Sequence, residues 1–131
     1  MKKPLGWILG MALTAVMVSP LLADTMGNSH MMMHAGKPVT LTATVVDMNC
    51  YLVQGLHGPG HVGCAKACIL NGQEMGLMTS DGKILPILGG GPNDTPNKKL
   101  LGFVEQRVTV TGEEFSGNGQ TGILLKSIHK A

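Results

Sequence analysis

Aromatic side chains and charge are both scarce in this chain of 131 residues: aromatics make up 3% of it and charged residues 14%. With 44% apolar residues, the chain has too little charge and too much hydrophobicity to be disordered. The few aromatics and the 19 glycines predict a modest core with many tight turns. They also exclude a stacking platform for single-stranded nucleic acid. The length predicts one small domain.

A dense cationic surface is missing as well. The chain has ten basic and eight acidic residues, and two of the basic ones, Lys2 and Lys3, belong to the N-terminal segment described below. Without them the formal net charge is zero, apart from the histidines. Neither nucleic acid nor an anionic membrane surface is therefore expected as a partner.

The motifs of several enzyme classes are absent from the sequence. There is no G-x-S-x-G elbow, and the three glycines at 89–91 lack the Lys-Ser/Thr of a phosphate loop. Glu113 and Glu114 are adjacent, and adjacent residues of a strand point to opposite faces, so they cannot flank one glycosidic bond. The chain is expected not to be an enzyme, with a thiol oxidoreductase role as the one exception considered.

The first 23 residues have the pattern of a secretory signal peptide. Lys2 and Lys3 give a positive start, residues 5–18 form an apolar run, and Ser19-Pro20 ends it before a cut after Ala23. The run is shorter than the roughly 20 residues of a membrane span. We therefore expect a periplasmic or secreted protein with no stable membrane anchor after signal removal.

The rest of the chain divides into two parts. Residues 24–37 are rich in Met and His and are predicted to form a flexible tail, and residues 38–131 are predicted to form an OB-like β-barrel domain. Apolar residues alternate with polar ones, or lie between turn signals, in five predicted strands, at 39–46, 75–79, 83–88, 108–112 and 121–128.

The connections between these strands complete the fold prediction. A helix is predicted at 64–70 and up to two helical turns at 97–104, whereas residues 48–63 are predicted to form an irregular loop. The strand order predicts a mainly β fold, a small five-stranded OB-like barrel with one or two short helices. An open sandwich is the alternative.

Three short motifs resemble a group of small secreted bacterial domains of OB type. They are Val-Val-Asp-x-x-Cys-Tyr at 45–51, His-x-x-Cys-Ala-x-x-Cys at 61–68 and Gly-Leu-Met-Thr-x-Asp-Gly at 76–82. The resemblance covers residues 40–128. It implies the fold and export from the cytoplasm, and no activity is established for the group.

The cysteines and one histidine form the main candidate site. In a helix over 62–70, His61, Cys64 and Cys68 share one stripe, and the preceding loop can fold Cys50 back over it. Three sulfurs and one imidazole match the ligands of a tetrahedral soft-metal site, for copper first and zinc second. In an oxidising compartment, a structural disulfide between Cys50 and either Cys64 or Cys68 is the competing prediction.

The tail contains a second candidate copper site. It concentrates thioethers and imidazoles, which favour copper over zinc, in the run His30, Met31, Met32, Met33 and His34. The alternative is an unstructured linker with chance Met enrichment.

The sequence thus predicts an exported binding module that holds a soft metal. Two alternatives stay open. One is a disulfide-stapled periplasmic adaptor for a protein or small-molecule partner of unknown identity, and the other is a thiol redox partner that uses Cys64 and Cys68, although their C-x-x-x-C spacing is not the usual C-x-x-C.

Overall fold

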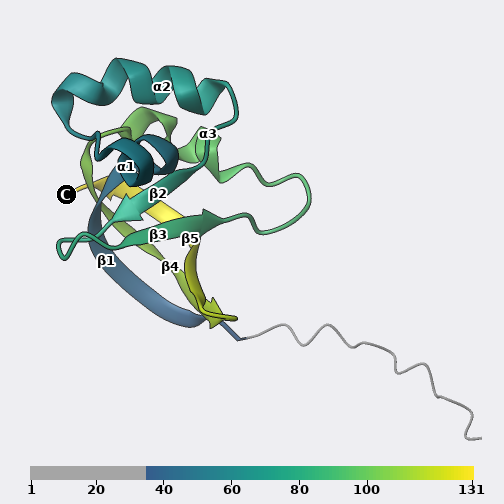
Figure 1. The fold of residues 1–131 in the computed structure, drawn as a ribbon. Coiled ribbons are helices and arrows are strands. Elements are labelled where there is room, and N and C mark those ends of the chain that lie inside the picture. Colours follow the sequence, from purple (N-terminus) through teal and green to yellow (C-terminus); the bar gives the residue numbers. More distant parts are fainter. Residues whose placement is uncertain (1–34) are drawn as a thin grey trace, which may run out of the picture. The chain divides into compact units, whose positions relative to one another are not determined.

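The computed structural model describes residues 35–131. The predicted signal peptide and the Met/His run at 30–34 lie outside the described residues. The described elements, in chain order, are β1 (Lys37–Asp47), α1 (Met48–Gln54), the 3-10 turn η1 (Pro59–His61), α2 (Val62–Leu70), β2 (Met75–Met78), β3 (Ile84–Leu88), α3 (Pro96–Leu100), the 3-10 turn η2 (Leu101–Phe103), β4 (Arg107–Gly117) and β5 (Gln120–Lys130) (Figure 1).

The five strands form a closed barrel in the order β1-β2-β3-β5-β4. All neighbouring strands are antiparallel except β3 and β5, which pair in parallel through Ile87 with Ile123 and Leu88 with Leu124. This confirms the predicted mainly β, five-stranded barrel and excludes the open sandwich. Closure also pairs strand edges that an open sheet would expose.

Alternation along β1 explains how the barrel is filled. Ala43 and Val45 are buried, whereas Thr42 is exposed and Thr44 is half-buried. Side chains alternate between the faces of a strand, so the apolar set points inward. The core joins these residues to apolar side chains of the other strands, of two helices and of the segment before β4, namely Ala65, Ile69, Met75, Leu77, Ile87, Leu100, Val104, Val108, Val110, Ile123 and Leu125.

Two tight turns match the sequence signals for hairpins. Gly82, after Asp81, has a φ of 80° and joins β2 to β3, with its N–H donating to the Thr79 carbonyl at 3.0 Å. Asn118 and Gly119 both have positive φ values, 51° and 78°, as a two-residue hairpin turn requires. The strands on either side of this turn, β4 and β5, are longer than predicted.

The predicted loop over 48–63 is wrong in its first half, because residues 48–54 form α1. Asp47 is the N-cap of this helix, and its Oδ1 accepts the N–H of Cys50 at 3.0 Å. Gly55 ends the helix in the left-handed conformation, with a φ of 69°. The helix is only seven residues long, so its apolar pattern is too short to reveal it, but both caps were present in the sequence.

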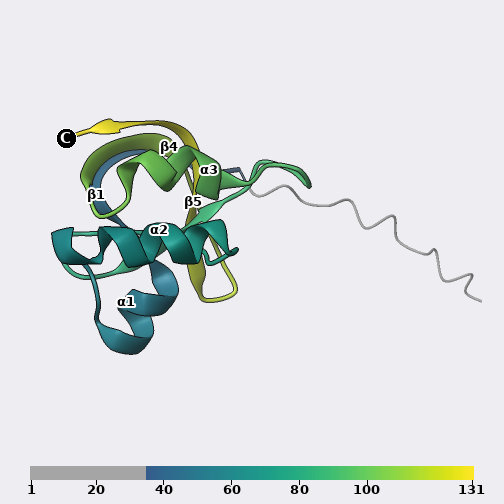
Figure 2. The same ribbon diagram turned by 90° about the horizontal axis from the view of Figure 1, so that it is seen from above.

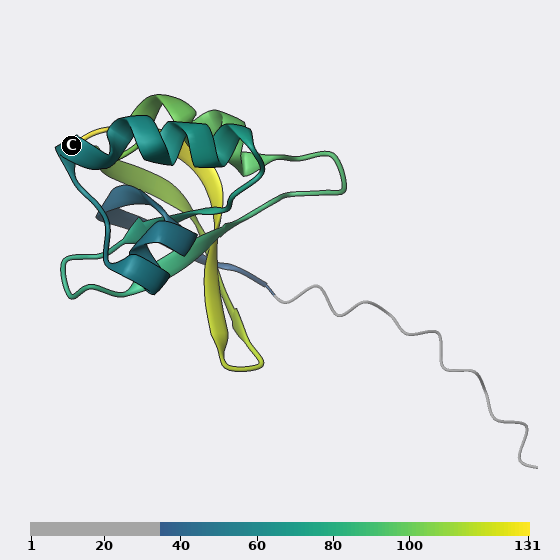
Figure 3. The ribbon, with the colours of Figure 1, turned by 45° about the horizontal axis from the view of Figure 1, so that its top comes forward.

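The helices lie at the end of the barrel opposite the β4–β5 hairpin tip (Figures 1 and 3). Helix α2 ends where predicted but begins two residues earlier, at Val62, and it buries Ala65 and Ile69 against the core. Viewed from above, α1 lies on one side of α2 and α3 on the other (Figure 2). Residues 35–131 therefore form three short α-helices, where the sequence predicted one or two. Among residues 35–131, no helix is long and apolar enough to cross a membrane.

Candidate metal centre

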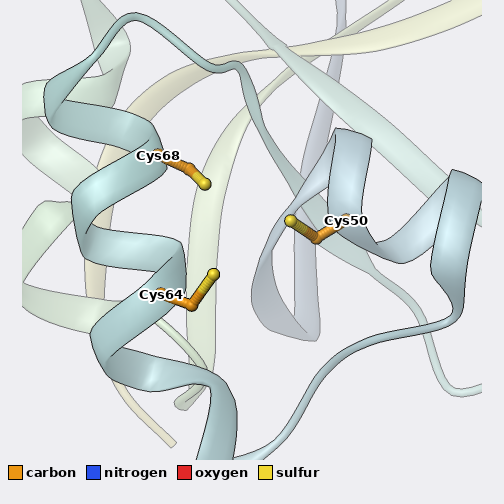
Figure 4. A group of neighbouring side chains, drawn as sticks. All are labelled: Cys50, Cys64 and Cys68. Atoms are coloured by element: carbon orange, nitrogen blue, oxygen red, sulfur yellow. The ribbon is translucent and has the colours of Figure 1, made fainter.

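Three cysteines from two helices meet between α1 and α2. Cys50 projects from α1, and Cys64 and Cys68 project from successive turns of α2 toward it (Figure 4). The three Sγ atoms all lie within 4.8 Å of one another. A cluster of this kind can hold a metal ion, and the sequence prediction that these cysteines come together is confirmed.

The cluster runs from the protein interior to the surface. Cys50 is buried, Cys68 is half-buried and Cys64 is exposed, and all three are free thiols. A metal ion can therefore reach the sulfurs from the Cys64 side while Cys50 anchors the inner side.

The surroundings of the cluster favour protonated thiols when no metal is bound. Burial raises the pKa of Cys50, and the neighbouring Asp47 carboxylate adds to the shift. Burial also raises the pKa of Cys68, from 9.0 to about 12, with further contributions from Asp47 and Cys50. A metal ion at this cluster must therefore displace protons from the sulfurs.

Asp47 is the polar residue most closely tied to the cluster. Its side chain is fully buried at the end of β1, and its Oδ1 accepts the N–H of Cys50 at 3.0 Å. Its other oxygen, Oδ2, is buried without a partner. Sequence analysis missed this residue, although its place three positions before Cys50 is the spacing of a helix N-cap.

His61 is not part of the group of three sulfurs that meets the 4.8 Å limit. It is buried, as are Ala65 and Ile69 at successive four-residue intervals along α2. Its Nδ1 lies 2.9 Å from Oε1 of Glu105, and its Nε2 is buried without a partner. The predicted stripe of His61, Cys64 and Cys68 is thus divided between the core and the cysteine cluster.

Glu105 is a second residue that sequence analysis missed. Its backbone has a φ of 56°, which is uncommon for a residue with a side chain. Its N–H donates to the Val45 carbonyl at 2.8 Å, and its Oε2 accepts the N–H of Gly58 at 2.7 Å. Glu105 thereby fixes the segment before α2 to the barrel, and no local pattern in the sequence reveals such a contact.

The chain was compared with protein-family models, with curated proteins and with solved structures. None of the three comparisons found a match.

Proposed function

We propose that this protein is an exported metal-binding module that holds a soft or borderline metal ion through Cys50, Cys64 and Cys68. The observation that carries the proposal is the approach of three sulfurs from two helices to within 4.8 Å of one another. With Zn–S bonds of about 2.3 Å, tetrahedral sulfurs lie about 3.8 Å apart, so side-chain adjustments on the order of 1 Å would complete the site.

The ligand type limits the choice of metal. Thiolates select Cu(I) and Zn(II) over hard cations such as Mg²⁺ and Ca²⁺. Three thiolates alone suit Cu(I), whereas Zn(II) takes a fourth ligand. The Met/His run at 30–34 supports copper as a second metal, bound at a separate auxiliary site in the tail.

The proposed export of the protein rests on the signal-like segment at 1–23. Export also supports the alternative function, in which two of the cysteines form a disulfide, because an oxidising compartment promotes disulfides. One pair of these sulfurs would have to approach from within 4.8 Å to about 2.05 Å for that bond. The protein would then be a stapled adaptor, or a redox partner if the bond cycles.

The test is the intact mass of the protein purified from the periplasm, measured natively and then after denaturation with a thiol-alkylating reagent, together with metal analysis of the same sample. We expect about one thiolate-bound zinc or copper per chain and three alkylated cysteines in denaturant. Metal that persists in Cys68→Ser would place it elsewhere. A metal-free protein two mass units light, with one alkylated cysteine, would overturn the proposal in favour of a disulfide.

A further inference from the structure

Two buried side-chain atoms have no hydrogen-bond partner within the described residues, and both lie close to the cysteine cluster in the chain. They are Oδ2 of Asp47, three residues before Cys50, and Nε2 of His61, three residues before Cys64. Buried polar atoms are nearly always satisfied, so each of these exceptions needs an explanation. A cation at the cluster would supply one.

Asp47 is the better placed of the two. The hydrogen bond from the Cys50 N–H to Oδ1, 3.0 Å long, fixes the carboxylate against the first turn of α1 and leaves Oδ2 for another partner. Burial, together with hydrogen bonding to this carboxylate, raises the pKa values of both Cys50 and Cys68, so Asp47 lies beside both thiols. His61 precedes α2, and its Nδ1 lies 2.9 Å from Oε1 of Glu105.

The burial of Asp47 gives an energetic reason for a cation. The side chain has no solvent exposure, and a buried carboxylate with an unpartnered oxygen costs free energy unless a positive charge compensates it. No Lys or Arg is paired with Asp47 within residues 35–131. A divalent ion between the carboxylate and the thiolates would compensate the charge.

We propose that Oδ2 of Asp47 is the fourth ligand of the metal centre, which makes a three-sulfur, one-oxygen site that selects Zn(II) over Cu(I). The inference rests on the proposed function and names the metal for it. Carboxylate oxygen is a regular zinc ligand, whereas Cu(I) prefers sulfur. On binding, each of the three thiols releases its proton to solvent as its sulfur bonds the ion.

The four atoms are not all within 4.8 Å of one another, because only the three sulfurs meet that limit. Cys64 is the ligand that is free to move, since it is exposed on the surface of α2. Asp47 and Cys50 are both buried and joined by a hydrogen bond. We therefore expect the ion to bind against the buried pair and to draw Cys64 inward.

The test compares the full chain with Asp47→Asn in binding Zn²⁺, Co²⁺ and Cu⁺, each alone and under reducing conditions against a competing chelator. Asn keeps an oxygen that can cap α1, so the variant removes the negative charge and the second oxygen with little change to the helix. Asp81→Asn is the matched control, because Asp81 is an exposed aspartate of the β2–β3 turn. His61→Gln tests the other unpartnered atom.

Asp47→Asn is expected to lower Zn²⁺ affinity at least about tenfold and to shift the visible spectrum of bound Co²⁺, while Cu⁺ affinity at the cysteines changes little. Asp81→Asn should match the parent in Zn²⁺ affinity, in the Co²⁺ spectrum and in Cu⁺ affinity. An equal loss of Zn²⁺ and Cu⁺ affinity, or an unchanged Co²⁺ spectrum, would overturn the assignment of Asp47. The same result in His61→Gln in place of Asp47→Asn would assign the fourth ligand to His61.

The parent chain separates a failure of this inference from a failure of the proposed function. If it binds none of the three ions at the cysteines, the metal-binding function itself is wrong. If Asp47→Asn does not fold, X-ray absorption at the zinc edge of the zinc-loaded parent chain identifies the ligands without a variant. Three sulfurs and one oxygen at about 2.0–2.2 Å, without imidazole scattering, is the expected result, and four sulfurs or an imidazole signal is the contrary one.

Discussion

Glu105 and His61 are 44 residues apart in the chain, and Oε1 of Glu105 lies 2.9 Å from Nδ1 of His61. Both side chains are buried, and the second carboxylate oxygen accepts the N–H of Gly58. One side chain thus fixes the segment from which α2 starts. Helix α2, which carries Cys64 and Cys68, begins at the residue after His61.

Glu105→Ala is expected to destabilise the protein by about 1.5–3 kcal/mol, because it removes buried hydrogen bonds to a carboxylate. Urea unfolding of the metal-free protein measures the loss. Glu113→Ala is the control, since it breaks only the surface pair with Lys126 and should cost at most about 1 kcal/mol. Equal losses in the two variants would contradict the role given to Glu105.

Alkylation of the folded, metal-free protein should follow the exposure of the three cysteines. Cys64 is exposed and should react first, whereas burial and raised pKa values keep Cys50 and Cys68 as unreactive thiols near neutral pH. Peptide mapping after timed iodoacetamide treatment gives the order. Bound metal should slow all three reactions, and faster modification of Cys50 than of Cys64 would contradict the arrangement of the cluster.

The raised pKa of Cys68 predicts a loss of stability at alkaline pH. The unfolded thiol loses its proton near pH 9.0, while the folded one holds it until about 12. The stabilisation is therefore complete below pH 9 and declines as the pH rises toward 12, because there the folded state binds more protons than the unfolded state.

Urea unfolding of the metal-free, reduced protein at about pH 8 and about pH 10.5 measures this decline. Cys68→Ala should decline less steeply than the parent over the same interval. Cys64→Ala serves as the matched control and should follow the parent. Parallel declines in the parent and in Cys68→Ala would contradict the assignment to Cys68.

Gly55→Ala should destabilise the protein by about 1–2 kcal/mol, because the backbone at the end of α1 has a φ of 69°. A methyl group at Gly55 would meet no atom within 4 Å, so the cost is that of the backbone alone. Gly63→Ala also meets nothing within 4 Å and has no positive φ, so a gain of about 0.4–1 kcal/mol is expected. Thermal unfolding should therefore show a lower midpoint temperature for Gly55→Ala and a higher one for Gly63→Ala than for the parent.

Replacing Met31, Met32 and Met33 together by Ala should reduce the copper bound per chain and leave zinc at the cysteines unchanged. The reason is that thioethers favour copper, whereas the cysteine cluster is built from other residues. Metal analysis after loading with each ion alone measures the effect. Unchanged Cu⁺ binding would show that the tail holds no copper site.

The barrel was predictable from the sequence because its signals are local. The Thr alternation of β1, the Asp81-Gly82 turn and the Asn71-Gly72 end of α2 each reflect the chemistry of a few neighbouring residues. The position of Cys64 and Cys68 on one face of a helix was predictable for the same reason, since four residues make about one helical turn.

The remaining parts of the site depend on contacts between distant segments. Helix α1 is too short for its periodicity to show, and the burial of Asp47 follows only from its place at the end of β1 beneath that helix. The pairing of His61 with Glu105 joins two different connections of the barrel. No local pattern in a single sequence predicts such contacts.

All three cysteines lie in one connection, between β1 and β2, and the closed barrel does not depend on them for its strand pairing. Its core is filled mainly by strand residues, with Ala65 and Ile69 as the contribution of α2. This differs from a small zinc finger, whose fold exists only with its ion. Loss of an ion from this connection is therefore expected to leave the barrel folded.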